Sequence, residues 1–284
     1  MSLSKALSRA QLQAVLQKVQ KLYPVAYADS AWDNTGLLID CTVESSAAKP
    51  RLLLAVDLTA AVAREAIEKE CNMILAYHPF IFPSWKKLDP WANSQHRSAV
   101  QLIQHGISVY CPHTAVDAAK GGVNDWLVQT LQGEVETCTA IERVTPLQGE
   151  EEHEVGYGRL VHFREPLSLA QIVQHVKRAL GVAHVQISTA KAPEDHLIQN
   201  VALCAGSGSG VFKGVSPGDV DLYYTGELSH HEILRYREAG KAVIVCNHSN
   251  TERGYLRDVM YKHIRELGVE CHVSAADVDP LQVM

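Results

Sequence analysis

Short apolar runs alternate with segments of helical period through the first part of this chain of 284 residues. Four runs predict strands, at residues 37–39, 52–56, 73–76 and 107–110, and two helical segments lie among them, at 59–70 and 98–105. Consecutive strands that are joined by right-handed helical crossovers become neighbours in one sheet. This order therefore predicts an α/β fold in which a largely parallel sheet has helices on its faces.

The same alternation continues after the break at Gly121-Gly122. Helices are predicted at about 124–131, 169–180 and 229–239, strands at 156–163, 201–205, 221–225 and 242–246, and a last long helix ends at Gly268. A polar stretch at 148–154 predicts either a domain boundary or an exposed loop. The length suits one large domain or two of common size, and we expect two.

Composition disfavours several classes of function. The formal net charge is −6, the isoelectric point is near 6.1, and no run rich in Lys or Arg occurs, so direct nucleic-acid binding is disfavoured. No apolar stretch reaches the roughly 18 residues that a membrane helix needs. The seven Cys occur singly, without a CxxC pair, which is typical of small buried side chains in a reducing compartment.

The segment from Met1 to Ala28 carries Lys and Arg but no acidic residue, a pattern that resembles a mitochondrial presequence. The same segment has the signals of a helix that belongs to the domain. Ser8 and Gln11 suit a capping box, and Pro24 follows the expected end. One apolar stripe contains Leu12, Val15, Leu16 and Val19. These signals favour a structural helix in a cytoplasmic protein, with a mitochondrial location as the alternative.

Histidine and carboxylate side chains follow several of the predicted strands. The stretches concerned are Tyr77-His78-Pro79, His113-Thr114-Ala115-Val116-Asp117, Ser229-His230-His231 and His248-Ser249-Asn250-Thr251-Glu252. Because the carboxyl ends of parallel strands converge on one crevice, we expect these side chains to meet there. His nitrogen together with Asp and Glu oxygen suits zinc, iron, manganese or cobalt. The pattern therefore predicts a metal site.

Each candidate ligand also has a structural alternative. His78 could be a strand-end histidine, Asp117 could cap the turn before Gly121, and Glu252 could close a capping box with Ser249. The pair of His248 and Glu252 is favoured, because a loop residue and a carboxylate one turn later can bind the same ion.

The loop Gly206-Ser207-Gly208-Ser209-Gly210 offers backbone amides of the kind that bind phosphate. Its spacing matches neither GxGxxG nor a Walker loop, because position 211 is Val and no GK[ST] follows. A turn after a strand is the favoured interpretation, since glycine commonly supplies a positive φ.

Six ordered motifs that span nearly the whole chain resemble the Nif-three-like family, which is also labelled GTP cyclohydrolase type one, type-two. They are Trp32-Asp33-Asn34-Thr35-Gly36-Leu37-Leu38, Tyr77-His78-Pro79-Phe80-Ile81-Phe82, His113-Thr114-x-x-Asp117 with Gly121-Gly122-Val123-Asn124, Gly206-Ser207-Gly208, Thr225-Gly226-Glu227 with Ser229-His230-His231, and His248-x-x-x-Glu252. The resemblance implies two αβ-layered domains, the second inserted within the first, with two divalent metals in the cleft between them. On this basis, residues 1–127 and 245–284 form the outer domain and 128–244 the inserted one.

The resemblance also implies roles for individual residues. The metal ligands are His78, Asp117, His248 and Glu252, and Glu252 bridges two metals. Tyr77 departs from the family, which has a second imidazole there, so the second metal is held weakly, is bound by a phenolate or is absent. His113 is a candidate catalytic residue that orients a ligand or moves protons. His231 is a weaker candidate for the cleft wall, with a helix-start histidine as the alternative.

Two classes of function follow from the resemblance. The first is a metal-dependent hydrolase of a small phosphorylated or nucleotide-like substrate, with one or two divalent ions per chain. The second is a scaffold or transcription-linked interaction protein with a structural metal and a transcriptional co-regulator as its partner. Members of the family are typically ring-shaped hexamers built from dimers, so a homohexamer is expected in either case.

Overall fold

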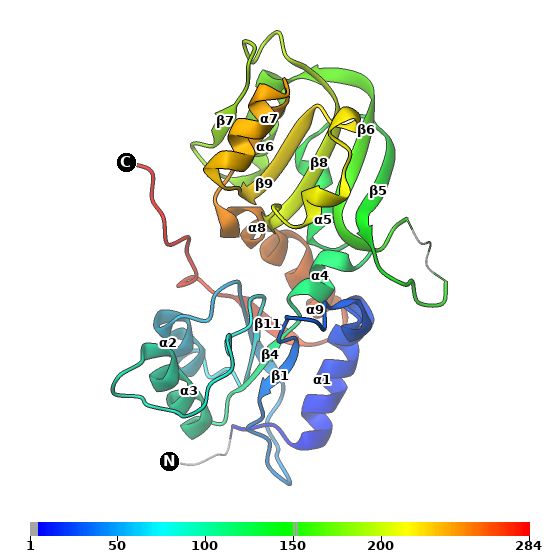
Figure 1. The fold of residues 1–284 in the computed structure, drawn as a ribbon. Helices are drawn as coiled ribbons and strands as arrows, with labels where there is room; N and C mark the ends of the chain where they lie inside the picture. Colours follow the sequence, from blue (N-terminus) through cyan, green and yellow to red (C-terminus); the bar gives the residue numbers. More distant parts are fainter. Residues whose placement is uncertain (1–4, 150, 152) are drawn as a thin grey trace. The chain divides into compact units, whose positions relative to one another are not determined.

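The structure is a computed structural model that describes residues 5–149, 151 and 153–284. The chain forms two compact units (Figure 1). Unit 1 comprises Met1–Val116 and Leu256–Val278, and unit 2 comprises Asp117–Tyr255 and Asp279–Met284. Unit 2 therefore interrupts unit 1 in the sequence. No helix in the described part of the chain is long and apolar enough to cross a membrane.

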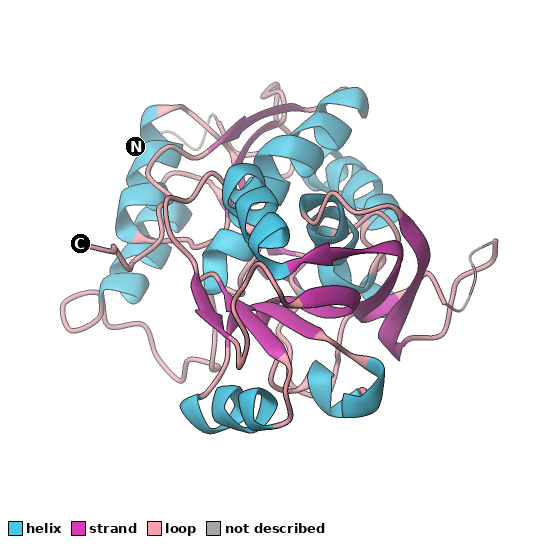
Figure 2. Ribbon diagram, turned by 90° about the horizontal axis from the view of Figure 1, so that it is seen from above, coloured by secondary structure: helices cyan, strands magenta, loops and turns pink. Residues whose placement is uncertain are grey.

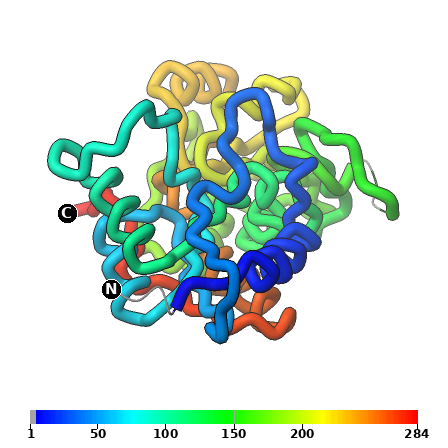
Figure 3. The backbone as a smooth tube through the Cα atoms, turned by 90° about the horizontal axis from the view of Figure 1, so that it is seen from below, coloured from blue at the N-terminus to red at the C-terminus, as the bar shows by residue number. Residues whose placement is uncertain are grey.

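Unit 1 is built on a five-stranded sheet with the order β1-β4-β3-β2-β11. Its strands are β1 (Gly36–Ile39), β2 (Arg51–Ala55), β3 (Met73–Ala76), β4 (Ser108–Cys111) and β11 (Glu270–Val273). All neighbouring pairs are parallel except β1 and β4. The prediction of a largely parallel sheet is confirmed. The late strand β11 lies against β2, so the two sequence segments of unit 1 share one sheet (Figure 3).

Helices cover both faces of this sheet. They are α1 (Arg9–Leu22), the 3-10 helix η1 (Val25–Tyr27), α2 (Ala60–Glu68), α3 (Ser94–Gln104) and α9 (Tyr261–Glu266). Residues of α2 and α3 form one apolar cluster with alternate residues of β2, β3 and β4, whereas α1 lies on the opposite face (Figure 1). This two-sided cover explains why the central strands are continuous apolar runs. The predicted capping box of Ser8 and Gln11 is present at the start of α1.

The predicted last helix is divided into three consecutive segments. These are α8 (Arg253–Tyr255), the π-helical segment η5 (Leu256–Met260) and α9. A π-helical insertion of this kind changes the register of the side chains that follow it.

The segment that follows β11 is fixed by two carboxylates of unit 1. Glu65 of α2 accepts hydrogen bonds from the Ser274 hydroxyl and from the N–H groups of Ala275 and Ala276. Burial alone would raise the pKa of Glu65, but these hydrogen bonds lower it below its ordinary value. The buried Asp277 carboxylate in turn accepts the N–H groups of Val56 (2.7 Å) and Asp57 (3.3 Å) at the end of β2.

Unit 2 contains a six-stranded sheet with the order β5-β6-β8-β9-β10-β7. Its strands are β5 (Val135–Arg143), β6 (Gly156–Ser168), β7 (Gln186–Ser188), β8 (Leu197–Ser207), β9 (Leu222–Glu227) and β10 (Ala242–Val245). The pairs β8/β9 and β9/β10 are parallel, and the other pairs are antiparallel. The strands β5 and β7 at the two edges were not predicted.

The helices of unit 2 pack on this mixed sheet (Figure 2). They are α4 (Thr114–Ala118), which begins in unit 1, α5 (Val123–Thr130), α6 (Leu169–Leu180), α7 (His230–Glu238) and α8, with the 3-10 helices η2 (Val211–Gly214), η3 (Pro217–Asp219) and η4 (His248–Thr251). Tyr236 of α7 joins an apolar cluster with residues of β8, β9 and β10. Thr130 of α5 contacts the hydroxyl of Tyr224, which is adjacent in β9 to the clustered Tyr223 and therefore points to the other face.

The boundaries of the units differ from the predicted domain boundaries. The first falls after position 116 and not after 127, and the second after 255 and not after 244. At the first boundary, α5 belongs to unit 2 because Asn124 donates to the Asp117 carbonyl and accepts from the Ala205 amide. At the second, β10 pairs with β9 and η4 packs near β8 and β9. The stretch 148–154 joins β5 to β6, so it is a loop within unit 2 and not a boundary; its residues 150 and 152 lie outside the described residues.

Candidate metal centre

The first group of candidate residues lies at the ends of β2 and β3 in unit 1. His78 follows β3, and its backbone N–H donates to the carbonyl of Val56 (3.0 Å), which continues the parallel pairing. Its Nδ1 is 2.9 Å from Oδ1 of Asp57, which follows β2. When Nδ1 carries the proton and donates to this carboxylate, Nε2 has the lone pair that a metal ion accepts. The contact with Asp57 thus fixes the orientation of the His78 ring.

His113 follows β4 in the same unit and is paired with Asp33. Its Nδ1 is 2.7 Å from Asp33 Oδ1, and the other oxygen of Asp33 accepts from the hydroxyls of Thr35 and Thr114. Burial would raise the pKa of Asp33, but the hydrogen bond and charge of His113 and the two hydroxyls lower it well below its ordinary range. His113 has a φ of +26°, a value that non-glycine residues rarely adopt. Strain of this kind is often retained at functional sites.

Tyr77 fills the space beside both imidazoles. Its ring centroid is 5.2 Å from that of His78 and 5.8 Å from that of His113, with edge-to-face geometry in each case. The residue is only 1% exposed. Tyr77 is therefore part of the packed support of His78 and His113.

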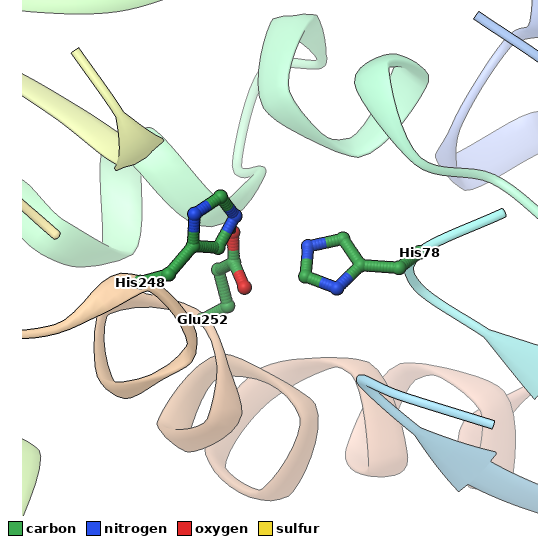
Figure 4. A group of neighbouring side chains, drawn as sticks. All are labelled: His78, His248 and Glu252. Carbon is green, nitrogen blue, oxygen red and sulfur yellow. Dashed lines mark ion pairs between the residues drawn. The ribbon is translucent and has the colours of Figure 1, made fainter. Parts of the chain in front are cut away.

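The second group lies in unit 2, where η4 follows β10. The side chains of His248 and Glu252 extend from this one turn and lie together (Figure 4). His248 Nε2 is 3.4 Å from Glu252 Oε1. Two ligands that bind one ion tetrahedrally at about 2.1 Å are about 3.4 Å apart, so the observed spacing fits both on one ion. Glu252 is 2% exposed, and a carboxylate so removed from water needs positive charge or hydrogen-bond donors beside it.

His248 is oriented by a carboxylate in the same way as His78. Its Nδ1 is 3.0 Å from Oε2 of Glu227, the last residue of β9, which directs Nε2 toward Glu252. The capping-box alternative for Glu252 is wrong. Ser249 lies inside η4, and its hydroxyl donates to Asp279 and accepts from Arg253.

Two glycines leave room for this turn. Gly206, at the first position of the predicted glycine loop, has a φ of +61°, and an added Cβ would lie 2.7 Å from Glu252 Oε1 and 2.8 Å from His248 Nε2. A Cβ on Gly226 would lie 2.7 Å from the Cα of His248. The backbone of Gly206 is fixed by hydrogen bonds with Thr251 and Thr225. The turn interpretation of the loop is consistent with this positive φ, and the turn brings its backbone close to the candidate ligands.

Asp117 lies in α4 and is half-buried. Burial raises the pKa of the Cys204 thiol well above its ordinary value, and the negative charges of Asp117 and Glu252 raise it further. At the turn that follows α4, the N–H of Gly121 donates to Asp125 at 2.6 Å.

Sequence reasoning gave no role to the carboxylates that orient the histidines. Asp33 and Glu227 belong to the quoted motifs, and Asp57 lies outside them, directly after the apolar run at 52–56. His231 is exposed in the first turn of α7, next to the capping box of Ser229 and Glu232, which agrees with the helix-start alternative.

Comparison with known proteins gives consistent matches over the whole chain. A family model described as Duf34/NIF3 (NGG1p interacting factor 3) matches residues 10–280. NGG1-interacting factor 3 of Saccharomyces cerevisiae is 56% identical over 291 residues, which cover 99% of this chain and 100% of that protein. Protein NIF3 homolog of Schizosaccharomyces pombe is 43% identical and covers 98% of this chain and 100% of its own length. The crystal structure of a Bacillus cereus protein related to NIF3 has a TM-score of 0.81 at 19% identity, covering 96% of this chain and 98% of that one, and shares the fold.

Proposed function

Because the chain belongs to the Duf34/NIF3 family, we propose that it binds a divalent metal ion and uses it to hydrolyse a small phosphorylated or nucleotide-like substrate. The observation that carries the proposal is the pair of His248 and Glu252 in unit 2, whose Nε2 and Oε1 atoms are 3.4 Å apart. His78 of unit 1 is the third proposed ligand. Asp117 is the fourth proposed ligand. Two imidazole nitrogens with carboxylate oxygens suit zinc, iron, manganese or cobalt.

The orientation of the two histidines supports this assignment. Each has its Nδ1 within 3.0 Å of a carboxylate of its own unit, Asp57 for His78 and Glu227 for His248. Histidines that bind metals almost always donate their second N–H to a carboxylate, carbonyl or water, and this contact fixes the tautomer. Surface histidines have no such requirement.

We propose one firmly bound ion per chain and a second site of lower affinity. The resemblance of the motif at 77–82 implies an imidazole at the position of Tyr77, and neutral imidazole is the better ligand for borderline metals. The buried position of the Tyr77 ring against His78 favours a packing role for this side chain.

A bound divalent ion supplies a Lewis acid and lowers the pKa of bound water from 15.7 toward about 7. The residues of the chain then have separate tasks. His113, whose Nδ1 is held by Asp33, is proposed to accept or return a proton at Nε2. When the rings of His78 and His248 are neutral, hydrogen bonds from Nδ1–H to Asp57 and Glu227 leave Nε2 as the atom with the free lone pair.

Metal content tests the site directly. We expect His248→Ala and Glu252→Ala to lose most of the bound divalent metal, measured by elemental analysis of the purified protein, while circular dichroism shows a folded chain. A matched control is the pair of half-buried His162 and exposed Glu136, whose Nε2 and Oε2 are 3.3 Å apart in the same unit. Alanine at either control position should leave the metal content unchanged. Full metal content in both His248→Ala and Glu252→Ala would exclude the assignment.

Turnover tests the reaction. Hydrolysis across a panel of phosphoesters and nucleotides should require divalent metal, rise with pH as bound water loses a proton, and be abolished by Glu252→Ala. The His162→Ala variant should retain the wild-type rate.

A non-enzymatic function is the second candidate. The name of the Saccharomyces cerevisiae relative, NGG1-interacting factor 3, favours a protein partner, and a transcriptional co-regulator is the class it suggests. In this case the metal is structural. Absence of turnover by metal-loaded protein, together with equal binding of such a partner to the wild type and to Glu252→Ala, would favour this candidate over the hydrolase.

We also propose that the chain assembles as a homohexamer, since closed symmetric assemblies are common among homo-oligomers. One chain has a mass of 31.2 kDa. Light scattering at micromolar concentration should give six times this mass. A mass of one chain would contradict the proposal.

A further inference from the structure

Two large aromatic side chains of unit 1 are exposed and touch each other. Trp32 is 53% exposed and Phe82 is 49% exposed. Their ring centroids are 6.3 Å apart with an interplanar angle of 80°. We call this pair the aromatic patch. Single exposed apolar side chains are common, but an exposed pair beside polar groups often marks a binding site.

The indole of Trp32 is held in one orientation despite its exposure. Its Nε1–H donates to Asp29 Oδ2 at 2.8 Å. The other oxygen of Asp29 accepts the N–H of Ala31, and the N–H of Asp29 donates to the Thr114 hydroxyl. A side chain that is already fixed loses little conformational freedom when a ligand binds. The exposed face of this ring is thus prepared for a contact that the chain itself does not make.

The aromatic patch is continuous with the candidate catalytic residue and one proposed metal ligand. The centroid of Trp32 is 5.7 Å from that of His113, and the centroid of His113 is 5.5 Å from that of His78. The imidazole of His113 therefore lies between Trp32 and His78 in this series of contacts. One small molecule can lie on the indole and reach His78.

We propose that the aromatic patch is a stacking subsite for a planar heteroaromatic ring of the substrate, whose reacting group lies toward His78. This inference rests on the proposed metal-dependent hydrolase and adds the substrate class. A planar ring is favoured because it uses the flat face of an immobilised indole and leaves the Trp32–Asp29 hydrogen bond intact. Two side chains are far too small for a stable protein interface, which needs about 800 Å² on each partner.

The test compares two probes that differ only in the ring. Adenosine 5′-monophosphate and ribose 5-phosphate share the phosphorylated sugar, and their affinities for the metal-loaded full chain are measured by calorimetry. We expect the wild type to bind the nucleotide about 10-fold or more tightly than the sugar phosphate, the effect of one base–aromatic stack. Trp32→Ala should reduce the ratio to within about 2-fold, and Trp32→Phe, which retains a ring, should keep most of it.

Two controls make the outcomes distinct. Trp91→Ala removes a tryptophan that is 90% exposed in the same unit and should leave the ratio unchanged. Quenching of indole fluorescence by adenosine 5′-monophosphate should disappear in Trp32→Phe and persist in Trp91→Phe. Equal affinity of the wild type for the two probes, or no loss of the ratio in Trp32→Ala, overturns the stacking subsite.

The same samples separate this inference from the proposed function. Metal content and hydrolysis of non-aromatic phosphoesters report on the hydrolase alone, so they can succeed while the ring preference fails. Failure of wild-type protein to bind the nucleotide overturns the subsite. Binding of phosphocholine that depends on Trp32, with no preference for the nucleotide, would assign the aromatic patch to a cation and overturn the ring assignment.

Discussion

Substitution of Gly206 by alanine should weaken metal binding much more than it destabilises the fold. Gly206 has a φ of +61°, and an alanine in this left-handed region costs about 1–2 kcal/mol of stability. Gly181, at the end of α6, has a φ of +70°, and a Cβ there meets nothing within 4 Å. Gly181→Ala is therefore a matched control that carries the same backbone cost without a collision.

The effect on the site follows from the distances to the added methyl group. In Gly206→Ala the new Cβ would lie 2.7 Å from Glu252 Oε1 and 2.8 Å from His248 Nε2, whereas ordinary contacts begin at 3.4 Å, so these atoms must move by at least 3.4 − 2.7 = 0.7 Å and 3.4 − 2.8 = 0.6 Å. Well-formed metal–ligand distances vary by only about 0.2 Å. We expect the affinity for the divalent ion to fall by roughly 10- to 100-fold, the size of effect seen when the support of a ligand is lost.

The two variants are compared by competition with a chromophoric chelator and by urea unfolding of the metal-free proteins. Both should unfold at lower urea than the wild type and by similar amounts, and only Gly206→Ala should lose metal affinity. If the two variants bind metal within about 2-fold of each other, His248 and Glu252 are not ligands. If Gly206→Ala unfolds far more easily than Gly181→Ala, the collision is relieved through the fold and the geometric argument is wrong.

Three further predictions concern unit 1. Asp277→Asn should weaken metal binding by about 10-fold with a small change in the unfolding midpoint, because Asp277 holds the backbone of Asp57, the partner of His78; unchanged affinity in calorimetry contradicts this role. Glu65→Gln should lower the free energy of unfolding by about 2 kcal/mol at neutral pH. The pKa of Glu65 is lower in the folded than in the unfolded chain, so the stabilisation is complete above pH 4.5, the ordinary pKa of this group, and is lost as the pH falls through the lowered pKa. The difference in the free energy of unfolding between Glu65→Gln and the wild type, measured by urea unfolding, should therefore shrink toward pH 3. Tyr77→His should raise the metal-to-protein ratio in elemental analysis or increase the affinity for the second ion in a metal titration. If neither the ratio nor the affinity changes, position 77 does not face the metals.

The elements that the sequence predicted are those whose signals are local. A capping box and a helical stripe identified α1, helical spacing identified α6, and continuous apolar runs identified β2, β3 and β8. The missed strands lack such signals. β5 and β7 are edge strands with many exposed residues, and β11 mixes Glu270 and His272 with two apolar residues. Their strand conformation depends on a neighbouring strand that is distant in sequence, so periodicity alone does not reveal it.

The candidate ligands were predictable for a similar reason, since His248 and Glu252 are one turn apart and their geometry is local. The boundaries between the two units were not predictable from the sequence. They depend on which sheet α5 and β10 join, and that choice is made by tertiary contacts such as those of Asn124 with the main chain of Asp117 and Ala205. A helix of eight residues with an apolar face fits either unit by its pattern alone.

The carboxylates that orient the histidines follow a rule that links topology to chemistry. Asp57 and His78 are 21 residues apart, and so are Glu227 and His248. In both pairs the carboxylate is at the carboxyl end of one strand and the histidine follows the next, adjacent and parallel strand, β2 with β3 and β9 with β10. One strand–helix–strand repeat therefore brings a carboxylate beside an imidazole Nδ1 and directs Nε2 away from it. The same arrangement of a carboxylate and a histidine occurs in each unit. This repetition favours a functional role for the two histidines over a chance placement of polar residues at strand ends.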